Sequence, residues 1–143
     1  MQEVKRCLSL DIGDKTIGAA VSDLLGLTAQ GITTIKRTSN RDDLNHIGEI
    51  ITQYEVEKII IGLPKNMNGT EGESCEKVRR FSRKISALYP KMEIIFWDER
   101  LSTVAATKSL ISADVSRRKR KTVIDKMAAV HILQGYLDSN FHV

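Results

Sequence analysis

The sequence has no long hydrophobic run and no apolar leader. Its longest apolar stretches, such as Ile59 to Leu63, are far shorter than the roughly 20 residues that a membrane-spanning helix needs. The first residues, Met1 to Arg6, lack the apolar core of a secretory signal. We therefore expect a soluble, cytoplasmic protein without a membrane partner.

Cysteine and histidine are also scarce, which argues against disulfide or zinc chemistry. The two cysteines, Cys7 and Cys75, form neither a CxxC pair nor a disulfide framework, so we interpret both as reduced and structural. His46, His131 and His142 lie far in sequence from the acidic motifs described below, and we interpret each as a surface or core residue.

The basic residues, by contrast, are concentrated in one place. The segment Arg117, Arg118, Lys119, Arg120, Lys121 carries five charges in a chain of net charge +4, and removing them would leave −1. Clustered lysine and arginine bind phosphates because they release condensed counterions, which favours a nucleic-acid contact. A solvated loop or another anionic surface is the alternative. Aromatic residues make up only 5% of the chain, so binding would depend on charge rather than on base stacking.

Hydrophobic periodicity predicts an alternation of strands and helices. We expect strands at residues 4–12, 16–23, 31–36, 58–63 and 93–98. Helices are expected from a cap at Asn40 through Ile51, at 74–89, at 103–111 and at 123–137, with the basic segment separating the last two. A polar, glycine-containing loop at 64–72 links the fourth strand to the second helix.

This order predicts an α/β fold with a five-stranded mixed sheet, whose first three strands form a meander, and helices on both faces. The length favours a single domain, residues 1–143. The first strand should lie between the second and the fourth. In such sheets, functional residues lie at the carboxyl ends of the parallel strands.

A carboxylate stands at the carboxyl end of the first predicted strand. Asp11 follows the apolar residues Cys7 to Leu10 and is followed by Ile12 and Gly13. A buried carboxylate needs a proton, an ion pair, hydrogen bonds or a metal ion, and Gly13 would let a phosphate or a metal approach the backbone. The alternative is an aspartate that closes a turn through its own backbone, with Gly13 supplying the tight conformation.

Two other segments supply acids that could reach the same end of the sheet. The fifth strand ends in Asp98 and Glu99, and strand alternation allows at most one of them to face Asp11 without a bulge. Asp125 shares a helical stripe with residues that would let this helix approach the sheet: Ala128, Ala129, Ile132 and Tyr136.

Each of these acids also has a purely structural interpretation. Asp98 or Glu99 could pair with Arg100 or a nearby lysine, and Asp125 could complete a capping box with Thr122. Three acids from distant segments would nevertheless converge under the predicted topology. Oxygen ligands without a histidine or cysteine cluster suit Mg²⁺ or Mn²⁺ rather than zinc.

Five segments, taken in order, resemble a known family. They are LDIG at 10–13, IGAAVSD at 17–23, GLPKNMNG at 62–69, DERLST at 98–103, and DKMAA with ILQGYL within 125–137. Together they cover nearly the whole chain without a large insertion. They resemble the YqgF (RuvX) family of Holliday-junction-resolvase-like nucleases.

The resemblance implies an RNase H-like fold and a cytoplasmic nuclease that processes the 5′ end of the 16S ribosomal RNA precursor. It also implies that the family's acids correspond to Asp11, Glu99 and Asp125. Lys65 and the basic segment look like local variation that leaves these acids in place.

The residues and the resemblance together predict a divalent-metal-dependent phosphodiesterase. Asp11 would bridge one or two ions of Mg²⁺ or Mn²⁺, and Glu99 and Asp125 would complete the ligand set. Lys15, Arg100 and the basic segment would bind phosphates of RNA or of structured DNA. The loop at 64–72 could present backbone N–H groups, Asn66 or Asn68 beside the site, or could be a plain surface loop.

Other functions stay open from the sequence. A Holliday-junction-type DNA resolvase and a nucleic-acid-binding RNase H-like domain without catalysis would carry the same motifs. The actin, Hsp70 and sugar-kinase fold also opens with an Asp-x-Gly strand and a hairpin, which there bind ATP phosphates. Those proteins bind nucleotide between two such domains, whereas 143 residues hold only one.

Overall fold

The computed structural model describes the backbone of residues 6–101 and 117–141, and the side chains of residues 6–101 and 126–139. The elements are β1 (Arg6–Ile12), β2 (Thr16–Ser22), β3 (Ala29–Lys36), α1 (Asn40–Tyr54), β4 (Val56–Leu63), α2 (Glu73–Leu88), β5 (Glu93–Asp98), the 3₁₀ turn η1 (Glu99–Leu101) and α4 (Arg117–Phe141). All five predicted strands are present to within two residues at each end. The helix predicted at 103–111 lies outside the described residues.

Helix α1 begins with a cap one residue earlier than predicted. Ser39, rather than Asn40, is the N-cap residue, and its side chain accepts a hydrogen bond from the backbone N–H of Asp42 at 3.1 Å. Serine and asparagine cap helices about equally well, so composition alone could not distinguish the two positions. Ile47 and Ile51 are buried, so one face of α1 packs against the core.

The strands form a five-stranded sheet in the order β3-β2-β1-β4-β5. β1 pairs antiparallel with β2, and β2 pairs antiparallel with β3, which confirms the predicted meander. β1 pairs in parallel with β4, and β4 pairs in parallel with β5. The first strand is therefore central, and the carboxyl ends of β1, β4 and β5 lie at one edge of the sheet.

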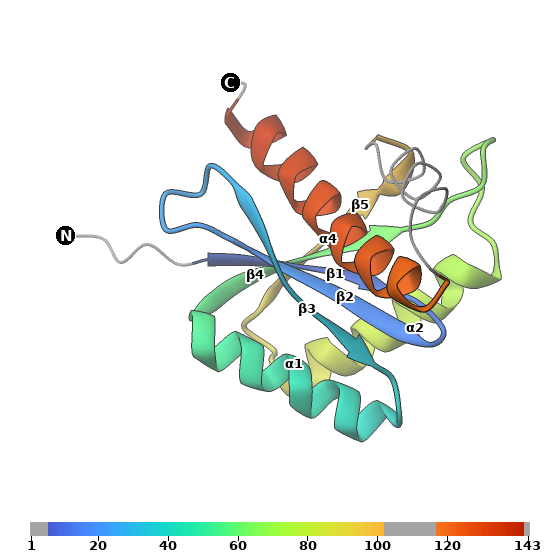
Figure 1. Ribbon diagram of the computed structural model, residues 1–143, viewed down its shortest axis with the longest axis horizontal. Coiled ribbons are helices and arrows are strands. Elements are labelled where there is room, and N and C mark those ends of the chain that lie inside the picture. The colour runs from blue at the N-terminus through green and yellow to red at the C-terminus, as the bar shows by residue number, and fades with distance from the viewer. Residues whose placement is uncertain (1–5, 102–116, 142–143) are drawn as a thin grey trace.

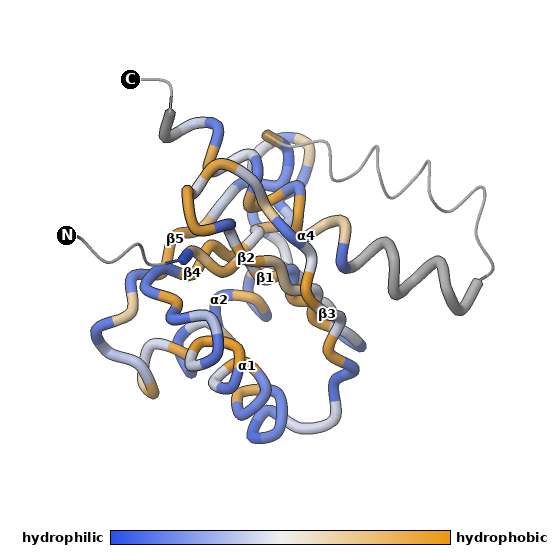
Figure 2. Tube along the Cα trace, turned by 60° about the vertical axis from the view of Figure 1, so that its left-hand side comes forward, coloured by the Kyte–Doolittle hydropathy of each residue, from blue (hydrophilic) through white to orange (hydrophobic). Residues whose placement is uncertain are grey.

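Helices cover both faces of this sheet, as predicted (Figure 1). Leu8 and Leu10 belong to the core under α1 and α2, whereas Ile60 belongs to the core under α4. The buried Ser9, between Leu8 and Leu10, also faces α4. Figure 2 shows the hydrophobic segments concentrated along the strands, between the two helical layers.

Helix α4 is longer than the sequence analysis predicted. It begins at Arg117, so the basic segment forms its first turns instead of a non-helical separator. Arginine and lysine are good helix formers, and no glycine or proline interrupts residues 117–134. Thr122 therefore lies inside the helix, and the capping-box interpretation of Asp125 is wrong. None of the described helices is both long and apolar enough to cross a membrane.

Small residues bring α4 close to the sheet. Ala128 and Ala129 are fully buried, and the Ser9 hydroxyl donates a 2.6 Å hydrogen bond to the Ala129 carbonyl. Nearer its carboxyl end, α4 contacts the start of β3, because the Gln134 side chain accepts from the Ala29 N–H at 2.9 Å. The helix therefore runs antiparallel to β1, and its first half extends toward the carboxyl ends of the parallel strands.

We expect Ala129→Leu to destabilise the protein by about 1 to 3 kcal/mol, because added volume in a packed core forces neighbouring groups apart. Leucine is a good helix former, so the loss would come from packing rather than helix propensity. Urea denaturation measures the change. Ser139→Leu, at an exposed position of the same helix, is the control and should stay within about 0.5 kcal/mol of wild type.

Candidate active site

Asp11 lies one residue before the end of β1, on the face of the sheet that α4 covers. It follows Ser9 by two residues, and alternate residues of a strand share a face. Both neighbouring strands place a glycine beside it. Gly18 of β2 pairs directly with Asp11, and Gly62 of β4 lies one residue beyond the last paired position between β1 and β4. No Cβ atom therefore crowds the half-buried Asp11 carboxylate from either strand.

Glu99 reaches the same face from the end of β5. A Cβ added at Gly62 would lie 3.1 Å from both Cγ and Oε1 of Glu99, and 2.6 Å from Cδ1 of Ile132 in α4. The glycine thus leaves the space that the Glu99 side chain occupies. Asp98 instead binds the guanidinium of Arg100 at 2.6 Å. As strand alternation predicted, Glu99 shares a site with Asp11 and Asp98 does not.

Asp11 and Glu99 line one cleft of about 430 Å³ at the carboxyl ends of the strands, and Oε1 of Glu99 is itself buried. The cleft is bordered by the turn after β1, by the segment between β3 and α1, and by α2. One more acid and four cations line it: Asp14, Arg37, Lys77, Arg80 and Lys84. Acidic and basic side chains therefore line the same cleft at this edge of the sheet.

Asp125 is placed by its backbone alone. It lies one turn before the buried Ala128 and Ala129 in α4, in the half of the helix that extends toward the strand ends. Its side chain lies outside the described residues, and so do those of the basic segment 117–121.

The described part of the cleft has the chemistry of a site for a hard divalent cation. Asp11 and Glu99 offer carboxylate oxygens, and no histidine or cysteine is among the residues that line the cleft. No group of three potential ligands occurs among the described side chains. A third protein ligand would have to come from beyond them, and Asp125 is the acid that the sequence motif offers.

Lys15 and Arg100, predicted to bind phosphate, do not line the cleft. Lys15 is exposed on the β1–β2 turn. Arg100 binds Asp98 and also donates to the Met67 carbonyl at 3.3 Å. The bound guanidinium lowers the pKa of the Asp98 carboxyl, so much of the charge of Arg100 is already compensated.

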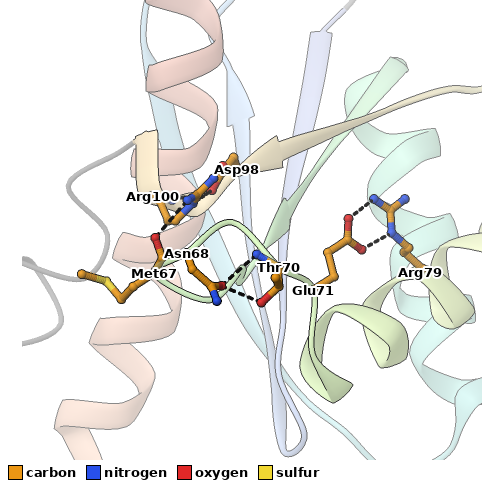
Figure 3. A network of polar contacts seen from close by, with 7 residues as sticks. All are labelled: Met67, Asn68, Thr70, Glu71, Arg79, Asp98 and Arg100. Carbon is orange, nitrogen blue, oxygen red and sulfur yellow. Dashed lines mark hydrogen bonds and ion pairs between the residues drawn. The ribbon is translucent and has the colours of Figure 1, made fainter.

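The loop at 64–72 is ordered by its own hydrogen bonds (Figure 3). Asn68 Oδ1 accepts from both the backbone N–H and the hydroxyl of Thr70, and Asn66 donates to the same hydroxyl at 3.0 Å. Glu71 continues the chain into α2 and binds Arg79 through two hydrogen bonds of 2.6 and 2.8 Å. Neither asparagine lines the cleft, whereas Pro64 at the start of the loop does, so a role of this loop beside the site stays a prediction.

Arg37 ties the turn after Asp11 to the start of α1. Its Nε binds the buried Asp43 carboxylate at 3.0 Å, and its Nη1 donates to the Gly13 carbonyl at 2.8 Å. Its Nη2 donates to the Asn40 side chain at 3.2 Å, and the guanidinium lies 4.9 Å from the centre of the Phe81 ring. We call this group the Arg37 clamp. It fixes the backbone two residues beyond Asp11.

Sequence reasoning missed the cations of the cleft. Lys77, Arg80 and Lys84 are spaced by three and four residues, so they lie on one face of α2. That spacing is visible in the sequence, but a charged helical face usually indicates only exposure to solvent. Arg37 gave no comparable signal, because its partners come from three separate segments.

Comparisons with known proteins agree with this architecture. A family model described as RuvX: Holliday junction resolvase matches residues 5–139. The chain is 56% identical over 137 residues to a Clostridium tetani protein named "Putative pre-16S rRNA nuclease", covering 96% of this chain and 99% of that protein. A protein of the same name from Clostridioides difficile is 59% identical over 133 residues, covering 93% and 94%.

Solved structures with the same fold include two resolvases. Thermus thermophilus RuvC in complex with a Holliday junction substrate matches with a TM-score of 0.57 and 12% identity, over 96% of each chain. The fowlpox virus resolvase with Holliday junction DNA matches with a TM-score of 0.56 and 15% identity, over 95% of this chain and 99% of that chain. These likenesses confirm the predicted RNase H-like fold.

We expect Arg37→Gln to destabilise the protein by about 2 to 4 kcal/mol. Breaking a buried ion pair typically costs about 3 to 5 kcal/mol, and the partial exposure of Arg37 should reduce this. Urea denaturation tests the estimate. Arg41→Gln, which removes an exposed arginine from the first turn of α1, should cost less than about 0.5 kcal/mol. Equal stabilities of the two variants would contradict the clamp.

The Glu71–Arg79 pair should make stability depend on pH in mild acid. Hydrogen bonds from Arg79 hold the pKa of the Glu71 carboxyl below its usual value, which is about 4.3 in an unfolded chain. A lowered folded-state pKa stabilises the fold above the unfolded-state pKa, and the benefit disappears as the pH falls through the folded-state pKa.

Wild type should therefore melt above Glu71→Gln by a constant margin at neutral pH. The margin should shrink below about pH 4.3 and vanish once Glu71 is protonated in both states. Calorimetry over this pH range measures it. Glu57→Gln, an exposed position in β4, serves as the control. A margin that stayed constant into strong acid would show that the pair does not stabilise the fold through charge.

Proposed function

Because the chain belongs to the RuvX family of Holliday junction resolvases, we propose that it is a divalent-metal-dependent nuclease that processes the 5′ end of pre-16S ribosomal RNA. One observation carries the metal-dependent chemistry. Asp11, near the end of β1, and Glu99, in the turn after β5, line one cleft together with four cations. This combination suits the hydrolysis of a phosphodiester, which needs a bound cation and a site for phosphate oxygens.

In the proposed mechanism, Asp11 and Glu99 bind the cation, and Asp125 of α4 contributes a third carboxylate. A bound Mg²⁺ or Mn²⁺ supplies a nucleophilic water at neutral pH and neutralises charge on the leaving oxygen. Gly18 adds no side chain beside Asp11, and Gly62 leaves the space that Glu99 and Ile132 occupy. The Arg37 clamp holds the turn after Asp11, so that this carboxylate keeps its direction when substrate binds.

RNA is favoured as the substrate by the relatives that are 56% and 59% identical, whose printed name specifies pre-16S rRNA. The description of the family model favours a second candidate, a DNA Holliday junction. The solved resolvase complexes share the fold with this chain at low identity and do not decide between the two. Lys15, Arg100 and the basic segment 117–121 are proposed to contact the nucleic acid outside the cleft.

Asp11→Asn should reduce cleavage at least about a hundredfold, since even changing a residue that only supports a metal ligand typically costs 10- to 100-fold. The fold should be kept, because asparagine has nearly the same shape. Cleavage is measured on structured RNA, single-stranded RNA and a DNA junction, with Mg²⁺, Mn²⁺, Ca²⁺ or a chelator. Asp42→Asn, an exposed residue of α1 with the same change of charge, is the matched control.

Full activity in chelator, or undiminished activity of Asp11→Asn, would refute the metal mechanism. Cleavage of the junction but not of RNA would select the resolvase. If wild type binds RNA but cleaves none under any metal condition, the remaining interpretation is a nucleic-acid-binding domain without catalysis. Asp125→Asn completes the series: because Thr122 is not a helix cap, a loss of activity with wild-type melting would support Asp125 as a ligand.

A further inference from the structure

Three cations of α2 form a row along one side of the cleft. Lys77, Arg80 and Lys84 lie on one face of the helix, and all three line the cleft with Asp11 and Glu99. Because α2 connects the parallel strands β4 and β5, it begins at their carboxyl ends and runs back along the sheet. Lys77 therefore lies near the acids' end of the helix, and Lys84 lies about two turns further from it.

The charges of this row are available to a ligand. Among the described side chains, Lys77 and Arg80 pair with acids of the turn and of α2 through exposed contacts of 3.4 to 3.8 Å. Exposed pairs of this kind contribute little and exchange readily for another anion. Lys84 has no ion-pair partner among the described residues. Arg79, on another face of α2, is committed to Glu71 and to the Phe96 ring.

The row of three cations extends along α2, away from Asp11 and Glu99. Lys84 follows Lys77 by seven positions of the helix, which corresponds to about 10.5 Å along the axis. A stacked polynucleotide strand has one phosphate about every 3.4 Å, so the row spans about three nucleotides. Among the described residues that line the cleft, the aromatic ring is that of Phe81, which is buried and covered by Arg37, so these residues offer no exposed ring for base stacking.

We infer that Lys77, Arg80 and Lys84 bind consecutive phosphates of a single polynucleotide strand, on one side of the phosphate that is cleaved. The three cations lie on one face of one helix along one side of the cleft, so the backbone of a single strand can follow them. Recognition along the row is electrostatic and independent of base identity. This inference rests on the proposed nuclease function and adds the path of the substrate strand.

Binding is tested apart from catalysis, in chelator, by fluorescence anisotropy of a labelled single-stranded RNA of about 12 nucleotides, within the usual range of single-strand sites. Lys84→Gln should lower the slope of log affinity against log salt by about 0.7, which corresponds to about fivefold weaker binding at 0.1 M salt. Arg83→Gln is the matched control. It removes one positive charge from the adjacent exposed residue of α2, which does not line the cleft.

An unchanged slope for Lys84→Gln, or an equal loss for Arg83→Gln, would overturn the inference, because the helix would then act only through its overall charge. Thermal melting of both variants checks that the fold is kept. Should wild type cleave no nucleic acid, the proposed function would fail while this comparison of slopes still tests the row.

Substrate length provides the second test, by cleavage with metal. RNAs are shortened stepwise from the 5′ side or from the 3′ side of the cut. On one side of the cut only, wild type and Lys84→Gln should differ in KM as long as the RNA extends about three nucleotides from the cut. Removing the third of these nucleotides should abolish this difference in KM, while kcat stays the same. A difference that persists on both sides, whatever the length, would refute a row of consecutive phosphate contacts.

Discussion

The parallel pairing of β1 with β4 determines where the acids of the candidate site can meet. This register places Asp11 beside Gly62, and the absent side chain at Gly62 leaves room for Glu99 to approach from β5. A shift of β4 by one residue would turn its side chains to the opposite face and put a leucine or an isoleucine at this place. The buried run of β4 is fully covered on both faces, which fixes the register strongly.

The acidic and the basic residues of the site come from different layers of the fold. Asp11 and Glu99 lie on the face that α4 covers, whereas the cations come from α2 and from the segment before α1, on the other face. They meet only at the edge of the sheet. The acids and the cations of the cleft are therefore contributed by opposite faces of the sheet. In the proposed mechanism a phosphate would lie between the basic side of the cleft and the acids that would hold the metal ion.

Local patterns predicted most of the fold, because alternation and apolar runs reflect backbone geometry directly. The apolar residues of β4, the meander, and the separate directions of Asp98 and Glu99 all follow from such rules. The start of α4 did not, since a run of arginine and lysine is compatible with both helix and loop. The Arg37 clamp could not be predicted, because contacts among distant segments leave no periodic signal. The roles of Asp11, Glu99 and Asp125 as metal ligands stay predictions.

The Arg37 clamp also links the site to the order in which the molecule opens. Arg37 follows the edge strand β3, and its partners belong to the central turn after β1 and to the first turn of α1. Edge elements usually separate from a sheet at lower free energy than central strands. Each local opening of β3 and α1 would therefore release the Gly13 carbonyl, even while β1 stays paired with β4. The turn after Asp11 would thus lose its tie to α1 whenever β3 and α1 open, while its own hydrogen bond from the Gly13 N–H to the Thr16 carbonyl persists.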